Sequence, residues 1–439
     1  MIASCQPFAP LLAEAAADSP PFVMILPFVA MLLAIAILPL VNKHHWEACY
    51  HYWALALGSI SVGYYLFSGA GLGRLGHTAH EYVSFLALVG SLFVVAGGIH
   101  IKVKGEAKPI VNVLFLLFGA IISNIIGTTG ASMLLIRPWI RMNKYRITAF
   151  HIVFFIFIVS NVGGCLTPIG DPPLFLGFLK GVPFWWTLQH AWVAWAVALG
   201  ILLTIFFILD VRNFLRAPKE IRDMETAEET WHFSGLRNLA FLAIILCSVF
   251  IKDPPFLREA IMVAAAVGSY FSTPRHLHQA NNFNFEPIKE VAWLFLGIFA
   301  TMMPALDYLQ IHAPELGLKT ELQYYWGTGL LSGVLDNAPT YLAFLATAFG
   351  MQGLDFDTGM TQFLATQGHI LLAISVASVF FGAATYIGNG PNFMVKAIAE
   401  RAKVATPGFF GYIVCYSLPI LLPTLFVIGI LFFSRWRLF

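Results

Sequence analysis

Long apolar runs separated by short polar segments cover most of the chain. Runs such as 22–41, 185–209 and 413–433 reach the roughly 20 residues that an α-helix needs to cross the hydrocarbon core of a bilayer. The longest polar segment, 210–237, carries both signs of charge. This pattern predicts membrane-spanning helices on either side of a solvated cytoplasmic linker. We expect residues 1–21 to form a short N-terminal tail and not a cleaved signal peptide.

Two apolar runs are interrupted by polar residues near their middle. Residues 110–141 contain the stretch SNIIGTTG at 123–130, which leaves arms of about 11–14 residues, half the length of a membrane span. Residues 324–349 are interrupted by DNAPT at 336–340. Polar loop residues between short arms predict a re-entrant hairpin in each run. The alternative for 110–141 is one long helix with a packing face of glycine and threonine.

Two other runs contain glycines and prolines that an α-helix cannot continue through. The first predicted broken helix covers 146–180 and the second covers 368–402. Their breaks share one pattern, T-x-I-G-[D/N]-x-P-x-F, at 167–175 and 385–393. The order of elements therefore repeats, and we expect an all-α polytopic membrane protein of two repeats, 22–209 and 238–439. Most Lys and Arg residues gather on one side if the N-terminus is outside, which makes the two repeats inverted.

The composition supports a membrane protein and excludes several other classes. The chain is 59% hydrophobic and 11% charged, whereas soluble domains carry about a quarter charged residues. The net charge of +2 forms no basic stripe, so we expect no nucleic-acid partner. The five cysteines lack metal-ligand spacing, and no catalytic grouping or phosphate loop is evident. We therefore predict that the protein is not an enzyme and has no cofactor.

Asp171 is the acidic residue of the first predicted break, and Asp336 is the acidic residue in the polar stretch of the second predicted hairpin. A carboxylate at the membrane centre is costly unless it is protonated, paired or bound to a cation. Burial favours the protonated form, so a proton and Na⁺ compete for the same oxygens. By sequence, Asp171 pairs with Asn389, and Asp336 pairs with Ser123, so each repeat contributes one acid. The alternative for each acid is a cap on a helix end.

Oxygen-bearing side chains and glycines at the same breaks complete the predicted site. Such weakly charged oxygen ligands suit Na⁺ or Li⁺ better than transition metals, although helix N-termini at the same places could hold an anion. The acids Asp171 and Asp336, with Asn124 and Asn337, are the expected Na⁺ ligands. The other candidate ion- or substrate-binding residues are Ser123, Thr128, Thr129, Asn161, Thr167, Gly170, Thr340, Thr385, Gly388, Asn389 and Asn392. His151, in an apolar run, is expected to pack on a helix face, and the alternative is a role in shuttling protons.

Three of these stretches resemble NhaD-type Na⁺/H⁺ antiporters, which belong to a superfamily with arsenite permeases and divalent-anion:sodium symporters. The stretches begin at Ser123, Asn161 and Leu335, and the resemblance extends over nearly the whole chain. It implies a scaffold, a moving transport domain with two hairpins, and a homodimer that works by an elevator movement. The anion-carrying relatives have S-N-T at both tips, whereas this chain has S-N-I and D-N-A, which disfavours a dicarboxylate substrate.

The predicted function is therefore a secondary transporter that exchanges Na⁺ or Li⁺ for H⁺ by alternating access. We expect it in the inner (plasma) membrane, in contact with membrane lipid. The alternative is Na⁺-coupled transport of a small carboxylate or oxyanion. A channel is a further alternative, against which the inverted hairpins argue.

Overall fold

The computed structural model describes residues 20–68, 71–102, 108–216, 232–251, 253–356 and 358–434. Within these ranges, eight helical segments of 18 residues or more are long and apolar enough to cross a membrane. With the apolar composition, they make the chain an integral membrane protein with several spans. Most of the predicted tail, and residues 217–231 of the predicted linker, lie outside the described residues.

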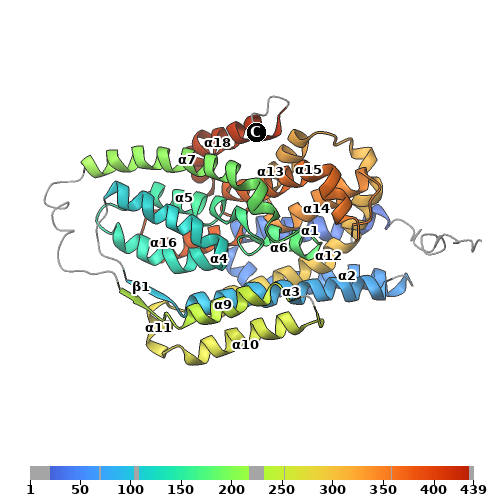
Figure 1. Cartoon of the computed structure of the whole chain (residues 1–439), viewed down its shortest axis with the longest axis horizontal. Coiled ribbons are helices and arrows are strands. Elements are labelled where there is room, and N and C mark those ends of the chain that lie inside the picture. The colour runs from blue at the N-terminus through green and yellow to red at the C-terminus, as the bar shows by residue number, and fades with distance from the viewer. Residues whose placement is uncertain are drawn as a thin grey trace, which may run out of the picture.

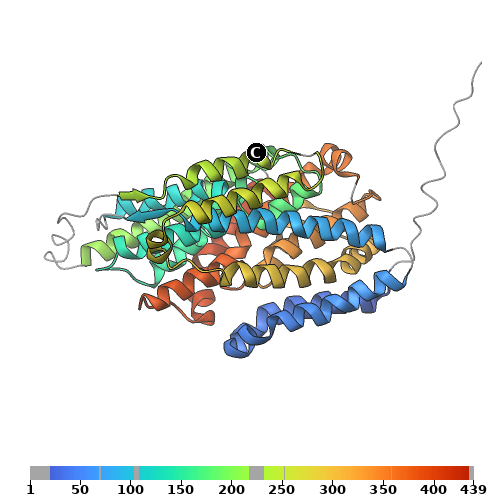
Figure 2. The same cartoon turned by 90° about the horizontal axis from the view of Figure 1, so that it is seen from below.

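Six helices form one side of the molecule, which we call the frame. In Figure 1, α3, α9 and α10 lie side by side, and each contacts the other two. The long helix α12 packs against α1, α2 and α3, and Figure 2 shows α1 and α2 at the lower edge. Asp307 of α12 binds Tyr65 of α2 and lies 2.6 Å from Arg74 of α3. The frame helices are α1 (Leu26–Val41, after the 3₁₀ turn η1, Phe22–Ile25), α2 (Lys43–Phe67), α3 (Leu72–Gly97), α9 (Asn238–Ser248), α10 (Leu257–Ser272) and α12 (Glu286–Leu316), with the short α11 (Arg275–Ala280) before α12.

The remaining helices form a second group, which we call the bundle. It contacts the frame where α4 packs against α3 and where α14 packs against α12. The elements of the bundle are α4 (Pro109–Met142), α5 (Ala149–Ile158), η2 (Val162–Leu166), α6 (Pro172–Leu179), α7 (Trp186–Arg216), α13 (Glu321–Ser332), α14 (Asn337–Met351), α15 (Met360–Phe381), η3 (Gly382–Ala384), α16 (Gly390–Arg401), α17 (Phe409–Tyr412), η4 (Ile413–Leu421, a π-helix) and α18 (Leu422–Phe433).

Helix α4 folds back on itself at Gly127. A straight helix of its 34 residues would be about 51 Å long. Asn112 near its start nevertheless donates a 2.8 Å hydrogen bond to Asn143, just beyond its end, and the rings of Phe115 and Trp139 are stacked. The alternative of one long helix over 110–141 is therefore wrong. In the second half, α13 and α14 pack against each other and are joined at 333–336. Re-entry of these arms into the membrane and inversion of the repeats stay predictions.

Both expected broken helices are interrupted at the repeated pattern. In the first half, α5 and η2 end before the non-helical stretch 167–171, and α6 begins after it. In the second half, α15 and η3 end before 385–389, and α16 begins after it. Helix α15 begins earlier than the predicted 368, but it is kinked at Gln367, where φ is −133°.

The structure corrects two expectations about the connecting segments. The solvated linker does not begin at residue 210, because α7 continues to Arg216 and Asp210 is fully buried. Three polar residues bind that carboxylate, and they are far from it in sequence. The chain is also not purely α-helical. Strands β1 (His100–Lys102) and β2 (His232–Ser234) form an antiparallel pair with Ile101 opposite Phe233.

Candidate functional site

The two non-helical stretches meet inside the bundle. Asp171 and Asn389, the variable residues of the repeated pattern, are both extended, with φ of −143° and −153°. Each precedes a helix with proline in its first turn, a place where proline can begin a helix but where it prevents continuation from the previous one. Asn389 Nδ2 donates a 3.1 Å hydrogen bond to Asp171 Oδ1. The equivalent positions of the two breaks therefore contact each other directly.

Each break also needs a glycine at a close backbone contact. A Cβ on Gly170 would lie 2.1 Å from the carbonyl oxygen of Gly164, and a Cβ on Gly388 would lie 2.6 Å from that of Gly382. Only glycine avoids these clashes. Gly170 and Gly388 therefore shape the breaks through their missing side chains.

Each half has a tip, where α4 turns at Gly127 and where α13 passes into α14 at 333–337. The two tips align in a way that the sequence comparison missed. Pairing 119–135 with 328–344 without a gap places Ser332 at Ser123, Asp336 at Gly127 and Asn337 at Thr128. The contacts agree, because Ser123 donates to Val159 O and Ser332 to Ser378 O, at 2.8 and 2.7 Å. The predicted pairing of Asp336 with Ser123 is therefore wrong. Gly127 has φ of 78°, a conformation that favours glycine.

Asp171 is the point at which both tips and both breaks converge. It is 1% exposed. Its Oδ1 accepts hydrogen bonds from Thr128 Oγ1 at 2.6 Å and from Asn389 Nδ2, and its Oδ2 accepts one from Asn337 Nδ2. Thr128 and Asn337 are the equivalent residues of the two tips, so each tip donates to a different oxygen of one carboxylate. All three donors are neutral side chains.

Asn337 has one amide atom without a partner. Its Oδ1 is buried and accepts no hydrogen bond within the part of the chain that the structure describes. Half a turn of the amide would place this oxygen where Nδ2 now meets Asp171. Asn337 can therefore donate to a charged carboxylate or accept from a protonated one.

Other predicted ligands connect the tips to the breaks through backbone contacts. Asn124 Nδ2 donates to Gly163 O at 2.6 Å, and Asn124 Oδ1 accepts from Leu166 N at 2.8 Å. Thr167 Oγ1 donates to Asn124 O at 2.6 Å. Asn124 thus supports the first break with both of its amide atoms, and its expected role as a Na⁺ ligand stays a prediction.

The second break is supported by a similar set of side chains. Asn161 Nδ2 donates to Asn392 Oδ1 at 2.7 Å, and Asn392 Nδ2 donates to Gly382 O and Thr385 O. Thr385 Oγ1 accepts the backbone N–H of Gly388 at 3.1 Å. These residues fix the path of the chain beside Asn389.

Asp336 caps a helix at the second tip and does not touch Asp171. Its Oδ1 accepts the N–H of Ala338 at 3.0 Å at the start of α14, which is the alternative role considered for this acid. Thr340 donates to the backbone oxygen of Asp336. Asp336 is still close enough to Asp171 for the two charges to repel each other.

Two cavities reach this centre from the side of the frame. One, of about 30 Å³, is lined by Asp171, Thr128 and Thr129. The other, of about 160 Å³, is lined by Thr129, Asn389 and Asp336, and by Glu47 of α2 and Glu290 of α12. Among the residues that line this larger cavity in the described structure, none is Lys or Arg. Thr129 borders both cavities.

A family model described as "Putative citrate transport" matches residues 17–433. The match covers nearly the whole chain. The chain belongs to this family. No curated protein matches the chain. Membership in the citrate-transport family makes the protein a membrane transporter, and both breaks and both tips lie within the matched residues.

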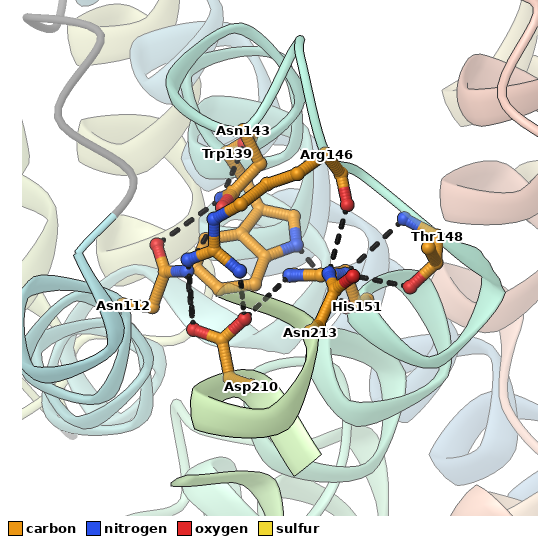
Figure 3. A network of polar contacts seen from close by, with 8 residues as sticks. All are labelled: Asn112, Trp139, Asn143, Arg146, Thr148, His151, Asp210 and Asn213. Carbon is orange, nitrogen blue, oxygen red and sulfur yellow. Dashed lines mark hydrogen bonds and ion pairs between the residues drawn. The ribbon is translucent and has the colours of Figure 1, made fainter. Parts of the chain in front are cut away.

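A buried ionic network in this member of the family escaped the sequence reasoning (Figure 3). Asp210 of α7 binds Arg146 and Asn112, and lies 3.0 Å from His151 Nε2. Because the backbone N–H of Thr148 donates to His151 Nδ1, the neutral ring donates to Asp210 through Nε2. The network ties the open ends of α4 to α5 and α7. His151 therefore serves as a hydrogen-bonding residue, and its buried polar position in an apolar run was the available signal.

Proposed function

We propose that this protein is a secondary transporter that exchanges Na⁺ or Li⁺ for H⁺, as the resemblance to NhaD-type antiporters suggests. The observation that carries the proposal is the convergence of both tips and the opposite break on the buried Asp171 carboxyl group. Asp171 belongs to the first break and accepts hydrogen bonds from the other three segments, so a change in what this carboxyl group binds changes contacts to all four.

The physical argument starts from the cost of burying a charge. A carboxylate at the bilayer centre costs about 2.5–3.5 kcal/mol on insertion scales, and no basic side chain contacts Asp171 in the described ranges. A proton or a small cation offsets this cost, and the two exclude each other at the same oxygens. The amide of Asn337 matches both states. Its Oδ1 accepts the proton of a neutral carboxyl group or contributes an oxygen ligand to Na⁺.

The charge of the larger cavity also favours a cation. Glu47, Glu290 and Asp336 line it, and its described lining contains no basic residue. An acidic cavity raises the local concentration of cations and repels anions. A multiply charged carboxylate would have to pass this field to reach the tips. We propose that Na⁺ or Li⁺ enters here and reaches Asp171 past Thr129.

The second candidate is Na⁺-coupled transport of a small carboxylate such as citrate. The family description favours it. Helix α14 begins at the second tip and helix α16 begins at the second break, and the free N–H groups of these helix ends could hold an anion. In that case Asp171 and its partners would form the Na⁺ site, and the carboxylate would bind at the helix ends.

Ion exchange in proteoliposomes separates the two candidates. Vesicles with an internal pH-sensitive dye receive NaCl, LiCl or KCl, with and without citrate, and labelled citrate uptake is measured in parallel. We expect Na⁺ or Li⁺ to drive proton movement without citrate, and Asp171→Asn to abolish it. Asp253→Asn, at an exposed position outside the site, is the matched control and should keep full activity. The second candidate would be established if citrate uptake requires Na⁺ and if Na⁺ drives no proton movement without citrate.

We further propose that alternating access moves the bundle against the frame in an elevator-type motion within a homodimer. The separation of helices into these two groups, with the cavities between them, supports this motion. Cross-linking of membranes should yield a dimer. The location in the plasma membrane with the N-terminus outside is tested by labelling a cysteine placed before α1 with an impermeant reagent.

A further inference from the structure

A third, small cavity, of about 30 Å³, lies between the second arm of α4 and the loop that joins α11 to α12. Arg137 of α4 lines it on one side, and Asn281, Asn282 and Asn284 of the loop line it on the other. The rest of its described lining contains no Asp or Glu. The guanidinium group of Arg137 in the bundle therefore faces the side-chain amides of the frame loop across this cavity.

Arg137 has no partner for its charge among the residues that the structure describes. It is partly buried, and within the described ranges its guanidinium group makes no hydrogen bond or ion pair. Its charged neighbour is another cation, Arg401 at the end of α16, which is close enough to repel it. Elsewhere in the bundle a buried arginine is paired, as Arg146 is with Asp210. An unpaired guanidinium beside a second cation is the reverse of the usual arrangement.

The loop offers further donors and a fixed shape. The side chain of Asn281 lines the cavity and is held in place, because its Nδ2 donates to Gly97 O and Ile99 O, both at 2.8 Å. Asn284 Oδ1 accepts the N–H of Glu286 at 3.1 Å, which leaves its Nδ2 with one long contact, 3.5 Å, to Asn282 O. The planar fork of an arginine matches carboxylate and phosphate groups, and amide N–H groups complete such a site.

We propose that this cavity binds an oxyanion, a carboxylate or phosphate group, through Arg137 with added attraction from Arg401. The anion is either a small soluble one, such as inorganic phosphate, or the phosphate of an anionic lipid. A bound anion contacts α4 and the frame loop together, so it holds the bundle and the frame in the present arrangement. The site is distinct from the acidic cavity, in which Glu47, Glu290 and Asp336 repel anions.

Binding measurements on the full-length protein test the proposal. Purified protein is titrated with inorganic phosphate at constant ionic strength, and its melting temperature is compared in nanodiscs of neutral lipid and of lipid containing phosphatidylglycerol. We expect Arg137→Gln to weaken anion binding by about 10- to 100-fold, because hydrogen bonds to a charged group are lost. Arg141→Gln removes a charge one turn along the same helix, outside the cavity lining, and should bind like the wild type.

Each outcome decides between the two sources or overturns the site. Binding of a soluble anion that is lost in Arg137→Gln supports a soluble ligand, and a higher melting temperature only in anionic nanodiscs, again lost in Arg137→Gln, supports a lipid. Binding should persist in Asp171→Asn, which separates this site from the transport centre. If Arg137→Gln fails to fold, Arg137→Lys should give intermediate affinity. No response of the wild type in either arm, or equal responses in the Arg137 and Arg141 variants, would overturn the proposal.

Discussion

Replacing Asp171 with Asn separates the charge at the centre from its hydrogen bonds. Asn has almost the same shape, and its remaining oxygen can keep the bonds from Thr128 and Asn389. Its new NH₂ group then faces Asn337, whose unpartnered Oδ1 can turn to accept it. The variant therefore keeps a complete hydrogen-bond set, and we expect it to fold.

The expected magnitudes follow from these contacts. Hydrogen bonds to a charged acceptor contribute about 1.5–3 kcal/mol and neutral ones about 0.5–1.5 kcal/mol, so three bonds together lose on the order of 3 kcal/mol. Removal of the buried charge also removes its desolvation penalty, which is several kcal/mol, and this gain offsets the weaker hydrogen bonds. The free energy of unfolding should therefore change by less than about 2 kcal/mol. Proton-coupled exchange, by contrast, should fall at least about 100-fold, which corresponds to about 2.7 kcal/mol.

Thermal unfolding in detergent and Na⁺-driven proton movement in proteoliposomes measure the two quantities. The matched control is the double variant Asp171→Asn with Asn389→Asp, which moves the carboxyl group across a 3.1 Å contact to the other break. It should recover part of the exchange. Wild-type exchange by the well-folded single variant would refute the assignment of Asp171, and a collapse of its melting temperature would refute the stability argument.

Three further substitutions test the supporting structure. Asp210→Asn leaves Arg146 buried without its counter-charge and should cost about 3–5 kcal/mol of stability, read from thermal unfolding. Glu81→Gln removes the 2.9 Å ion pair between Glu81 of α3 and Lys180, which follows α6. It should lower the melting temperature because Lys180 stays buried without a counter-charge, and neutralising Lys180 as well should restore part of the loss. Gly170→Ala should abolish folded expression, whereas Gly390→Ala, whose Cβ meets no atom within 4 Å, should express normally.

Local sequence signals predicted where the helices stop but not how the tips align. Proline and glycine placed the breaks, because their effect on a helix is local. The alignment of the tips was misjudged because Asp336-Asn337 resembles Ser123-Asn124 over two residues. The gap-free comparison over 17 positions (119 to 135 against 328 to 344) pairs Asn337 with Thr128 instead, in agreement with their shared contact to Asp171.

Long-range partners explain the other differences from expectation. Asp210 was placed in a solvated linker because its neighbours in sequence are charged, but its partner Arg146 lies 64 residues earlier. The support that the Asn124 amide gives to backbone groups about 40 residues away was also not anticipated, while its predicted ion binding stays a prediction. Hydrogen-bond partners that distant leave no periodic signal in a single sequence.

Proton release on cation binding tests the central claim most directly, because it needs neither transport nor a membrane potential. Purified protein in weakly buffered detergent solution receives NaCl, LiCl or choline chloride while the pH is recorded. If a proton and Na⁺ compete for Asp171, Na⁺ and Li⁺ release protons from the wild type, choline does not, and Asp171→Asn releases none. Equal proton release by the wild type and Asp171→Asn, or none from the wild type across the pH range in which it is folded, would contradict the account.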